Sequence, residues 1–96
     1  MGTVFVKAFA TVRDVLGGAG KVSVELREDA DIKFLLEVLA RRFGEKFIQE
    51  VLDEDGLPKK SIKIFVNGRD IDFLNGLSTV VRDGDEIALV PPVAGG

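Results

Sequence analysis

The strongest constraint on the fold is one apolar stripe of helical spacing in the middle of a 96-residue chain. Its members follow one another at intervals of three and four residues, which places them on one face of a helix. They are Ile32, Leu35, Leu36, Leu39 and Phe43. Carboxylates at positions 29 and 31 precede the stripe and can accept hydrogen bonds from the first free N–H groups of a helix. The stripe therefore predicts one main amphipathic helix that packs on a sheet.

The segments on either side of this helix alternate apolar and polar residues in the period-two manner of strands. Residues 3–10 and 21–27 precede it, and the glycine-rich loop 17–20 between them predicts an N-terminal hairpin. Residues 61–67, a short segment around Asp70 and Ile71, and residues 86–90 follow it. The order is ββαβββ, which predicts an α+β fold with a mixed sheet of about five strands. Only the first and last strands are apolar on both faces, so we expect them to be parallel neighbours in the centre.

Gly44 interrupts the helical pattern and is expected to end or kink the main helix. Phe47, Ile48, Val51 and Leu52 then continue the apolar spacing through a second helical segment, and a charged loop follows over residues 53–60. The pattern assigns no function to the segment Phe47–Lys60.

Composition excludes several classes of function. The chain contains neither cysteine nor histidine, which removes disulfides, thiolate nucleophiles and most transition-metal sites. Its net charge of −3 disfavours nucleic-acid binding, because phosphate contacts need a basic surface. No stretch approaches the ~18 apolar residues of a membrane span. We therefore expect a cytoplasmic protein without a metal site, a nucleic-acid partner or a membrane segment.

Three short motifs could carry chemistry, and each is better explained as local structure. Residues 53–56 space carboxylates before a glycine as a calcium loop does, but the closing ligands are missing. Residues 17–21 are similar to a phosphate-binding loop, but they lack its first glycine and its final Ser or Thr. Asp83 and Asp85 are spaced as in a tight turn, and we expect both to be exposed rather than catalytic.

The C-terminus is the most informative site. The last strand meets Pro91 and Pro92, and the sequence ends on Gly95 and Gly96. Prolines hold a segment extended, and glycines leave it thin enough to enter the active site of another protein. A domain over residues 1–90 and a flexible tail over 91–96 are predicted. The Gly96 carboxylate is then the reactive group, because ATP can convert it to an acyl-adenylate.

Three blocks of the sequence carry a family resemblance: residues 6–13 (Val-Lys-Ala-Phe-Ala-Thr-Val-Arg), residues 66–71 (Val-Asn-Gly-Arg-Asp-Ile) with 74–77, and residues 83–96, which end on the diglycine. The chain resembles the MoaD/ThiS family of ubiquitin-like sulfur carriers, and most closely the archaeal-type branch of the MoaD group. The resemblance implies a β-grasp fold, which agrees with the strand order obtained from the periodicity.

The resemblance also implies a reaction cycle in which this chain is a carrier and not an enzyme. An E1-like, MoeB-like enzyme adenylates the Gly96 carboxylate with Mg-ATP, and sulfur transfer then gives a C-terminal thiocarboxylate. The tail, Pro91, Pro92, Val93, Ala94 and Gly95, enters the active site of a MoaE-like large subunit of molybdopterin synthase. Sulfur passes there to precursor Z of the molybdenum or tungsten cofactor. The chain itself binds no cofactor in this scheme.

By position in the family, Phe9 and Val90 are implied to present apolar side chains to the partners, although Val90 replaces the more common aromatic residue. Two other classes of function stay open. The first is a ubiquitin-like protein modifier joined through Gly96 to lysines of target proteins, which needs the same adenylate. The second is a β-grasp interaction module whose tail is passive.

Overall fold

The computed structural model describes residues 2–92 of the chain. Five strands, three α-helices and two 3₁₀ helices occur in this range. In chain order they are β1 (Gly2–Ala8), α1 (Ala10–Val15), β2 (Lys21–Leu26), α2 (Ile32–Phe43), α3 (Glu45–Val51), β3 (Lys63–Val66), β4 (Arg69–Asp70), η1 (Ile71–Phe73), η2 (Gly76–Ser78) and β5 (Glu86–Val90).

The five strands form one mixed sheet in the order β2-β1-β5-β3-β4. β1 and β5 lie parallel in its centre, with Val6 opposite Ile87 and Ala8 opposite Leu89. The pairs β1–β2, β3–β5 and β3–β4 are antiparallel. The predicted five strands and the parallel central pair of the first and last strands are therefore confirmed, although β3 is shorter than the predicted strand over 61–67.

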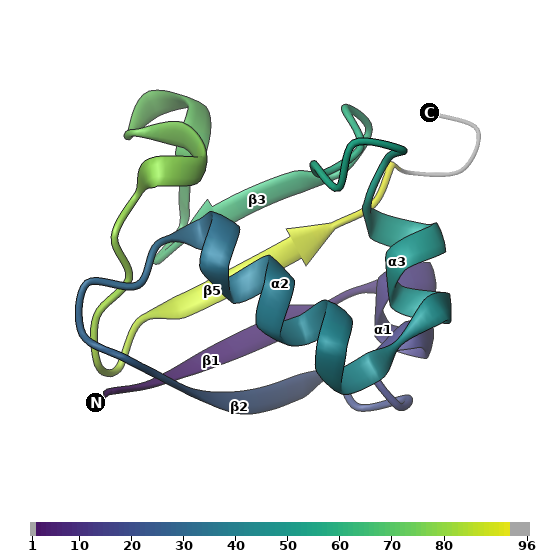
Figure 1. The fold of residues 1–96 in the computed structure, drawn as a ribbon, viewed down its shortest axis with the longest axis horizontal. Helices are drawn as coiled ribbons and strands as arrows, with labels where there is room; N and C mark the ends of the chain where they lie inside the picture. Colours follow the sequence, from purple (N-terminus) through teal and green to yellow (C-terminus); the bar gives the residue numbers. More distant parts are fainter. Residues whose placement is uncertain (1, 93–96) are drawn as a thin grey trace.

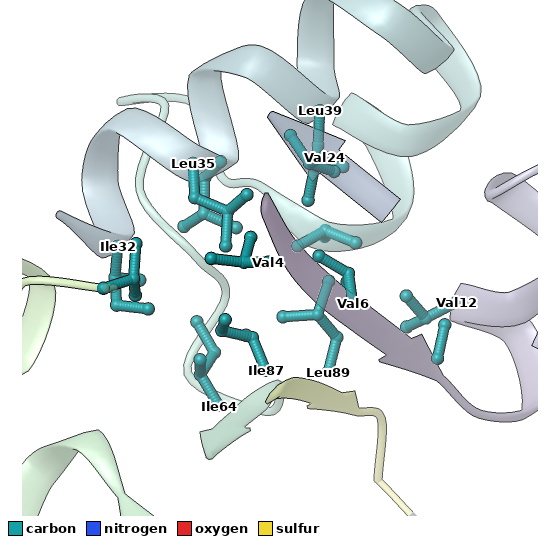
Figure 2. Close-up of a cluster of buried hydrophobic side chains, with 14 of the residues drawn as sticks. Val4, Val6, Val12, Val24, Ile32, Leu35, Leu39, Ile64, Ile87 and Leu89 are labelled. Atoms are coloured by element: carbon teal, nitrogen blue, oxygen red, sulfur yellow. The ribbon is translucent and has the colours of Figure 1, made fainter. Parts of the chain in front are cut away.

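Helix α2 crosses one face of this sheet, as Figure 1 shows. Figure 2 shows Leu35 of α2 directed towards Val4 of β1, and Leu39 beside Val24 of β2. Leu35, Leu39, Ile87 and Leu89 are all fully buried. Each such leucine or isoleucine stabilises the fold by about 1.5–3 kcal/mol relative to an exposed side chain. Burial of these side chains between α2 and the sheet therefore stabilises the fold.

The ends of α2 are set by the residues that the sequence singled out. A carboxylate oxygen of Asp31 accepts a hydrogen bond of 2.8 Å from the backbone N–H of Phe34, which satisfies one free donor of the first turn. Gly44 ends the helix with φ of 77°, in the left-handed region that favours glycine. Helix α3 begins at the next residue, so the predicted second helical segment is confirmed.

The connection between β1 and β2 differs from the prediction. The strand predicted over 3–10 ends at Ala8, and α1 lies before the glycine-rich turn, so the two strands are not joined by a simple loop. Val12 and Leu16 are buried, and Val15 packs against the core. Their spacing of three and four residues is the helical signal. The β-branched residues Thr11 and Val12 obscure it, because such residues are more typical of strands.

Candidate functional site at the carboxyl ends of the central strands

Phe9 and Val90, the two residues predicted to contact partner proteins, lie at the same end of the sheet because the two central strands are parallel. Parallel strands end at the same edge of a sheet, and Ala8 is paired with Leu89 at that edge. Phe9 and Val90 each follow one of these paired residues. Phe9 is 49% exposed and Val90 is half-buried, so neither belongs to the core. This placement is compatible with the partner contact implied for both residues, which stays a prediction.

The base of the C-terminal segment is partly packed. Pro91 is buried and Pro92 is exposed, so contact with the domain extends to the first of the two prolines. Val93, Ala94, Gly95 and Gly96 lie outside the described residues. The last described contact of this segment with the domain is thus at Pro91, directly after β5, whose neighbours include α1.

The face of the sheet opposite α2 carries half-buried side chains, and a charged cluster lies near its middle. Lys7 Nζ lies 2.9 Å from one carboxylate oxygen of Glu86, and Lys21 Nζ lies 3.4 Å from the other. Lys21 Nζ also lies 5.1 Å from the centre of the Phe5 ring. The hydrogen bond from Lys7 lowers the pKa of Glu86, with partial desolvation opposing it and Lys21 adding to it.

The sequence analysis did not identify this charged cluster. Alternation along β1 puts Phe5 and Lys7 on the same face of that strand, but the approach of Glu86 depends on the register between β1 and β5. Phe5 is paired with Glu86 in that register, which puts the carboxylate between lysines of β1 and β2. The only signal in the sequence was the predicted parallel pairing, which does not fix a register.

The acidic motif over residues 53–56 is occupied by local hydrogen bonds. One Asp53 carboxylate oxygen accepts from the backbone N–H groups of Asp55 at 2.9 Å and Leu57 at 3.1 Å, as in an Asx turn. Within residues 2–92, no group of three or more acidic side chains is arranged to hold a metal ion. The interpretation of this segment as a structural loop agrees with the geometry.

The carboxylates of Asp83 and Asp85 also have structural partners. Asp83 accepts from the Thr3 backbone N–H at 2.8 Å, and Asp85 accepts from the Asn67 side-chain amide at 2.9 Å. Asp85 also accepts from the Arg82 backbone N–H at 2.8 Å. These bonds hold the turn before β5 to the start of β1 and to the β3–β4 hairpin. Both carboxylates therefore position the central strand.

None of the helices between residues 2 and 92 has the length and apolarity that crossing a bilayer requires.

A mixed five-stranded sheet grasping one long helix, with the chain leaving from the central strand, defines a ubiquitin-like β-grasp protein. The ThiS family model matches residues 6–96, nearly the whole chain, and the protein belongs to this family. The expected MoaD/ThiS membership and β-grasp fold are thus confirmed.

Relatives carry two kinds of name. The chain is 42% identical to a candidate sulfur carrier protein of Archaeoglobus fulgidus over 72% of this chain and 77% of the relative. It is 34% identical to small archaeal modifier protein 3 of Haloferax volcanii over 92% of both chains. Among solved structures, SAMP1 of Haloferax volcanii has a TM-score of 0.87 at 30% identity, covering 99% of this chain and all of that one. A candidate molybdopterin converting factor subunit 1 of Pyrococcus furiosus has a TM-score of 0.75 at 35% identity, covering 97% and 100%.

Proposed function

We propose that this chain is a sulfur carrier that acts as the small subunit of molybdopterin synthase in the cytoplasm. The observation that supports it most is that the family match extends through the diglycine to residue 96. The likeness to a molybdopterin converting factor subunit at 35% identity supports the particular pathway. In this proposal the chain supplies the Gly96 carboxylate, and its partners supply the catalysis.

The first step is adenylation of the Gly96 carboxylate. A carboxylate oxygen attacks the α-phosphorus of Mg-ATP in an E1-like enzyme, and pyrophosphate leaves. Hydrosulfide, or a donor that delivers sulfur at the same oxidation level, then displaces AMP from the acyl carbon, and the chain ends in a thiocarboxylate. In a MoaE-like subunit the thiocarboxylate sulfur forms a carbon–sulfur bond to precursor Z. Water then cleaves the acyl–sulfur bond, which leaves the sulfur on the precursor and regenerates the Gly96 carboxylate. ATP and magnesium belong to the activating enzyme in this scheme, and the chain holds no cofactor of its own.

The carboxyl ends of β1 and β5, described above, provide a surface to which the partner proteins of these steps can bind. Phe9 is an exposed aromatic side chain beside the end of β5, and exposed apolar groups of this kind can anchor a partner. The buried Pro91 ties the base of the tail to this end of the sheet, so a partner that binds here lies next to the point where the tail begins. We propose that both the activating enzyme and the large subunit bind here, through Phe9 and Val90.

A second function uses the same adenylate. The likeness to a small archaeal modifier protein over 92% of the chain favours a ubiquitin-like modifier, in which a lysine amine of a target protein displaces AMP. An isopeptide bond through Gly96 then forms in place of a thiocarboxylate.

ATP–pyrophosphate exchange with a MoeB-like enzyme tests the activation step. The wild-type chain should support exchange, deletion of Gly96 should abolish it, and Gly95→Ala should slow it because a Cβ crowds a narrow channel. Ala94→Gly is the matched control, since it removes a methyl group and should retain activity. Exchange that survives deletion of Gly96, at an unchanged thermal midpoint, would favour the interaction module with a passive tail.

A further inference from the structure

The sheet has an incomplete edge on the side of β4. β4 pairs with β3 only at Phe65–Asp70 and Val66–Arg69, and the chain then turns into η1. Asn67 donates its backbone N–H to Glu86 of β5, so by alternation the N–H of Ile64 is directed away from β5, towards this edge. An unpaired strand edge of this kind can accept another strand.

A hollow of about 340 Å³ lies along this incomplete edge. Ile62 and Ile64 line it from the β3 side, and Ile71 and Leu77 line it from the 3₁₀ helices, so its floor is apolar. We call this hollow the β3-edge groove. Ile62 to Ile64 of an extended strand spans about 7 Å, so the groove adjoins only a short length of added strand.

Lysines dominate the charge of the groove. Lys59, Lys60 and Lys63 line it, against the carboxylates of Asp70 and Asp72. Lys63 Nζ is 3.9 Å from each of these carboxylates, at the limit of an ion pair. Lys60 makes no ion pair in the part of the chain that the structure describes. An incoming carboxylate would therefore find an uncompensated positive charge at the Lys60 end.

A large exposed aromatic residue follows the groove residues of η1 in the sequence. Phe73 is 87% exposed, and it directly follows Asp72, which lines the groove. Exposed aromatic residues at the border of an apolar hollow are typical anchors for protein partners. These features are complementary to an extended peptide. The edge of β3 offers backbone hydrogen bonds, the apolar floor and Phe73 offer apolar contacts, and the lysines offer positive charge.

We propose that the β3-edge groove with Phe73 is a docking site for an extended segment of a partner protein in which apolar and acidic residues alternate. The added strand pairs with β3 at Ile64 and places its apolar side chains on the floor formed by Ile71 and Leu77. Its acidic side chains lie on the other face, towards Lys60 and Lys63. Lys63 of the groove is paired with Val90, so this site adjoins the strand ends that carry Phe9 and Val90, but neither of those residues lines it. Its use does not depend on activation of Gly96.

Nuclear magnetic resonance of the ¹⁵N-labelled chain tests this site with a capped hexapeptide of alternating valine and aspartate. Saturable shifts are expected at Ile62, Ile64 and Leu77, with slower hydrogen exchange at the Ile64 amide. Lys60→Glu and Phe73→Ser should each weaken binding about tenfold. Lys33→Glu makes the same charge change on an exposed position of α2 and should leave the affinity unchanged.

Three results would overturn the proposal: no saturable binding, shifts confined to the β1–β5 face, or equal binding of the peptide that has lysine in place of aspartate. The spectra of the variants report folding directly. Both substituted side chains are exposed, so a folded spectrum is expected for each.

Discussion

The two faces of the sheet differ in what their residues contribute. On the face covered by α2, the central-strand residues Val4, Val6, Ile87 and Leu89 are at most 1% exposed. On the opposite face, Phe5, Lys7, Ala88 and Val90 alternate with them and are half-buried. The same two strands thus supply the stability of the fold on one side and an accessible surface on the other.

This difference separates folding from recognition. A substitution on the α2 face should unfold the chain without a specific effect on the C-terminus. A substitution near Phe9 or Val90 should weaken partner binding and leave stability nearly unchanged. The two faces can therefore be tested independently, which is not possible where one side chain serves both purposes.

The largest effect on stability is expected for Leu39→Ala. Leu39 is fully buried between α2 and the sheet, and leucine-to-alanine changes at such sites cost about 2–5 kcal/mol of unfolding free energy. Urea denaturation measures the change. Leu57→Ala is the matched control, because Leu57 is 40% exposed, and it should stay within about 0.5 kcal/mol of the wild type. Equal losses of unfolding free energy in both variants would contradict the assignment of Leu39 to the core and of Leu57 to the surface.

Phe9→Ser should next lower the affinity for the activating enzyme about tenfold, equivalent to about 1.4 kcal/mol. Stability should change by less than about 1 kcal/mol, because position 9 is the N-cap of α1 and serine is a favourable capping residue. Binding is measured by calorimetry. Phe73→Ser, which removes the exposed aromatic ring of η1, should not affect this affinity. If the Phe9→Ser variant binds the activating enzyme with wild-type affinity, Phe9 does not contribute to the partner-binding surface.

Asp31→Ala should destabilise the chain by about 1 kcal/mol, because the first turn of α2 loses the acceptor for the Phe34 N–H. Asp31→Ser retains a capping oxygen and should restore most of the loss. Thermal denaturation compares the three proteins. If the serine variant is no more stable than the alanine variant, the cap does not stabilise α2.

The smallest effect is expected for Glu86→Gln, and it depends on pH. The pKa of Glu86 is lowered in the folded chain by its hydrogen bond to Lys7, so the ionised carboxylate favours folding. The wild type should exceed the variant in stability above the unfolded pKa of about 4.3, and the difference should vanish as pH falls through the folded pKa. Denaturation midpoints across this range measure it, with Glu54→Gln in the exposed loop as control. A difference that persists in acid would require another cause.

Much of the fold could be predicted from the sequence because its signals are local. The stripe from Ile32 to Phe43 and the alternation in the strands depend on neighbours a few residues apart, and Gly44 marks the end of α2 through its backbone freedom. Helix α1 was missed because it has only six residues and its buried positions begin at a β-branched residue. A stripe that short cannot be distinguished from a strand by periodicity.

The site was only partly predictable for a different reason. The terminal diglycine is visible in the sequence, and the parallel central pair was predicted from the apolar character of both strands. The contact between Lys7 and Glu86 requires a register, and the groove beside β3 requires the early end of β4 at Asp70. Both depend on how distant segments pair, which the patterns of individual segments do not determine.

Mass spectrometry of the chain and its conjugates from the cells that produce it tests the central claim most directly. The proposal predicts a free chain in which one oxygen of the Gly96 carboxylate is replaced by sulfur. Diglycine remnants on lysines of other proteins, without a thiocarboxylate, would contradict the carrier role and establish the modifier. Both products together would mean that one activation step supplies two functions.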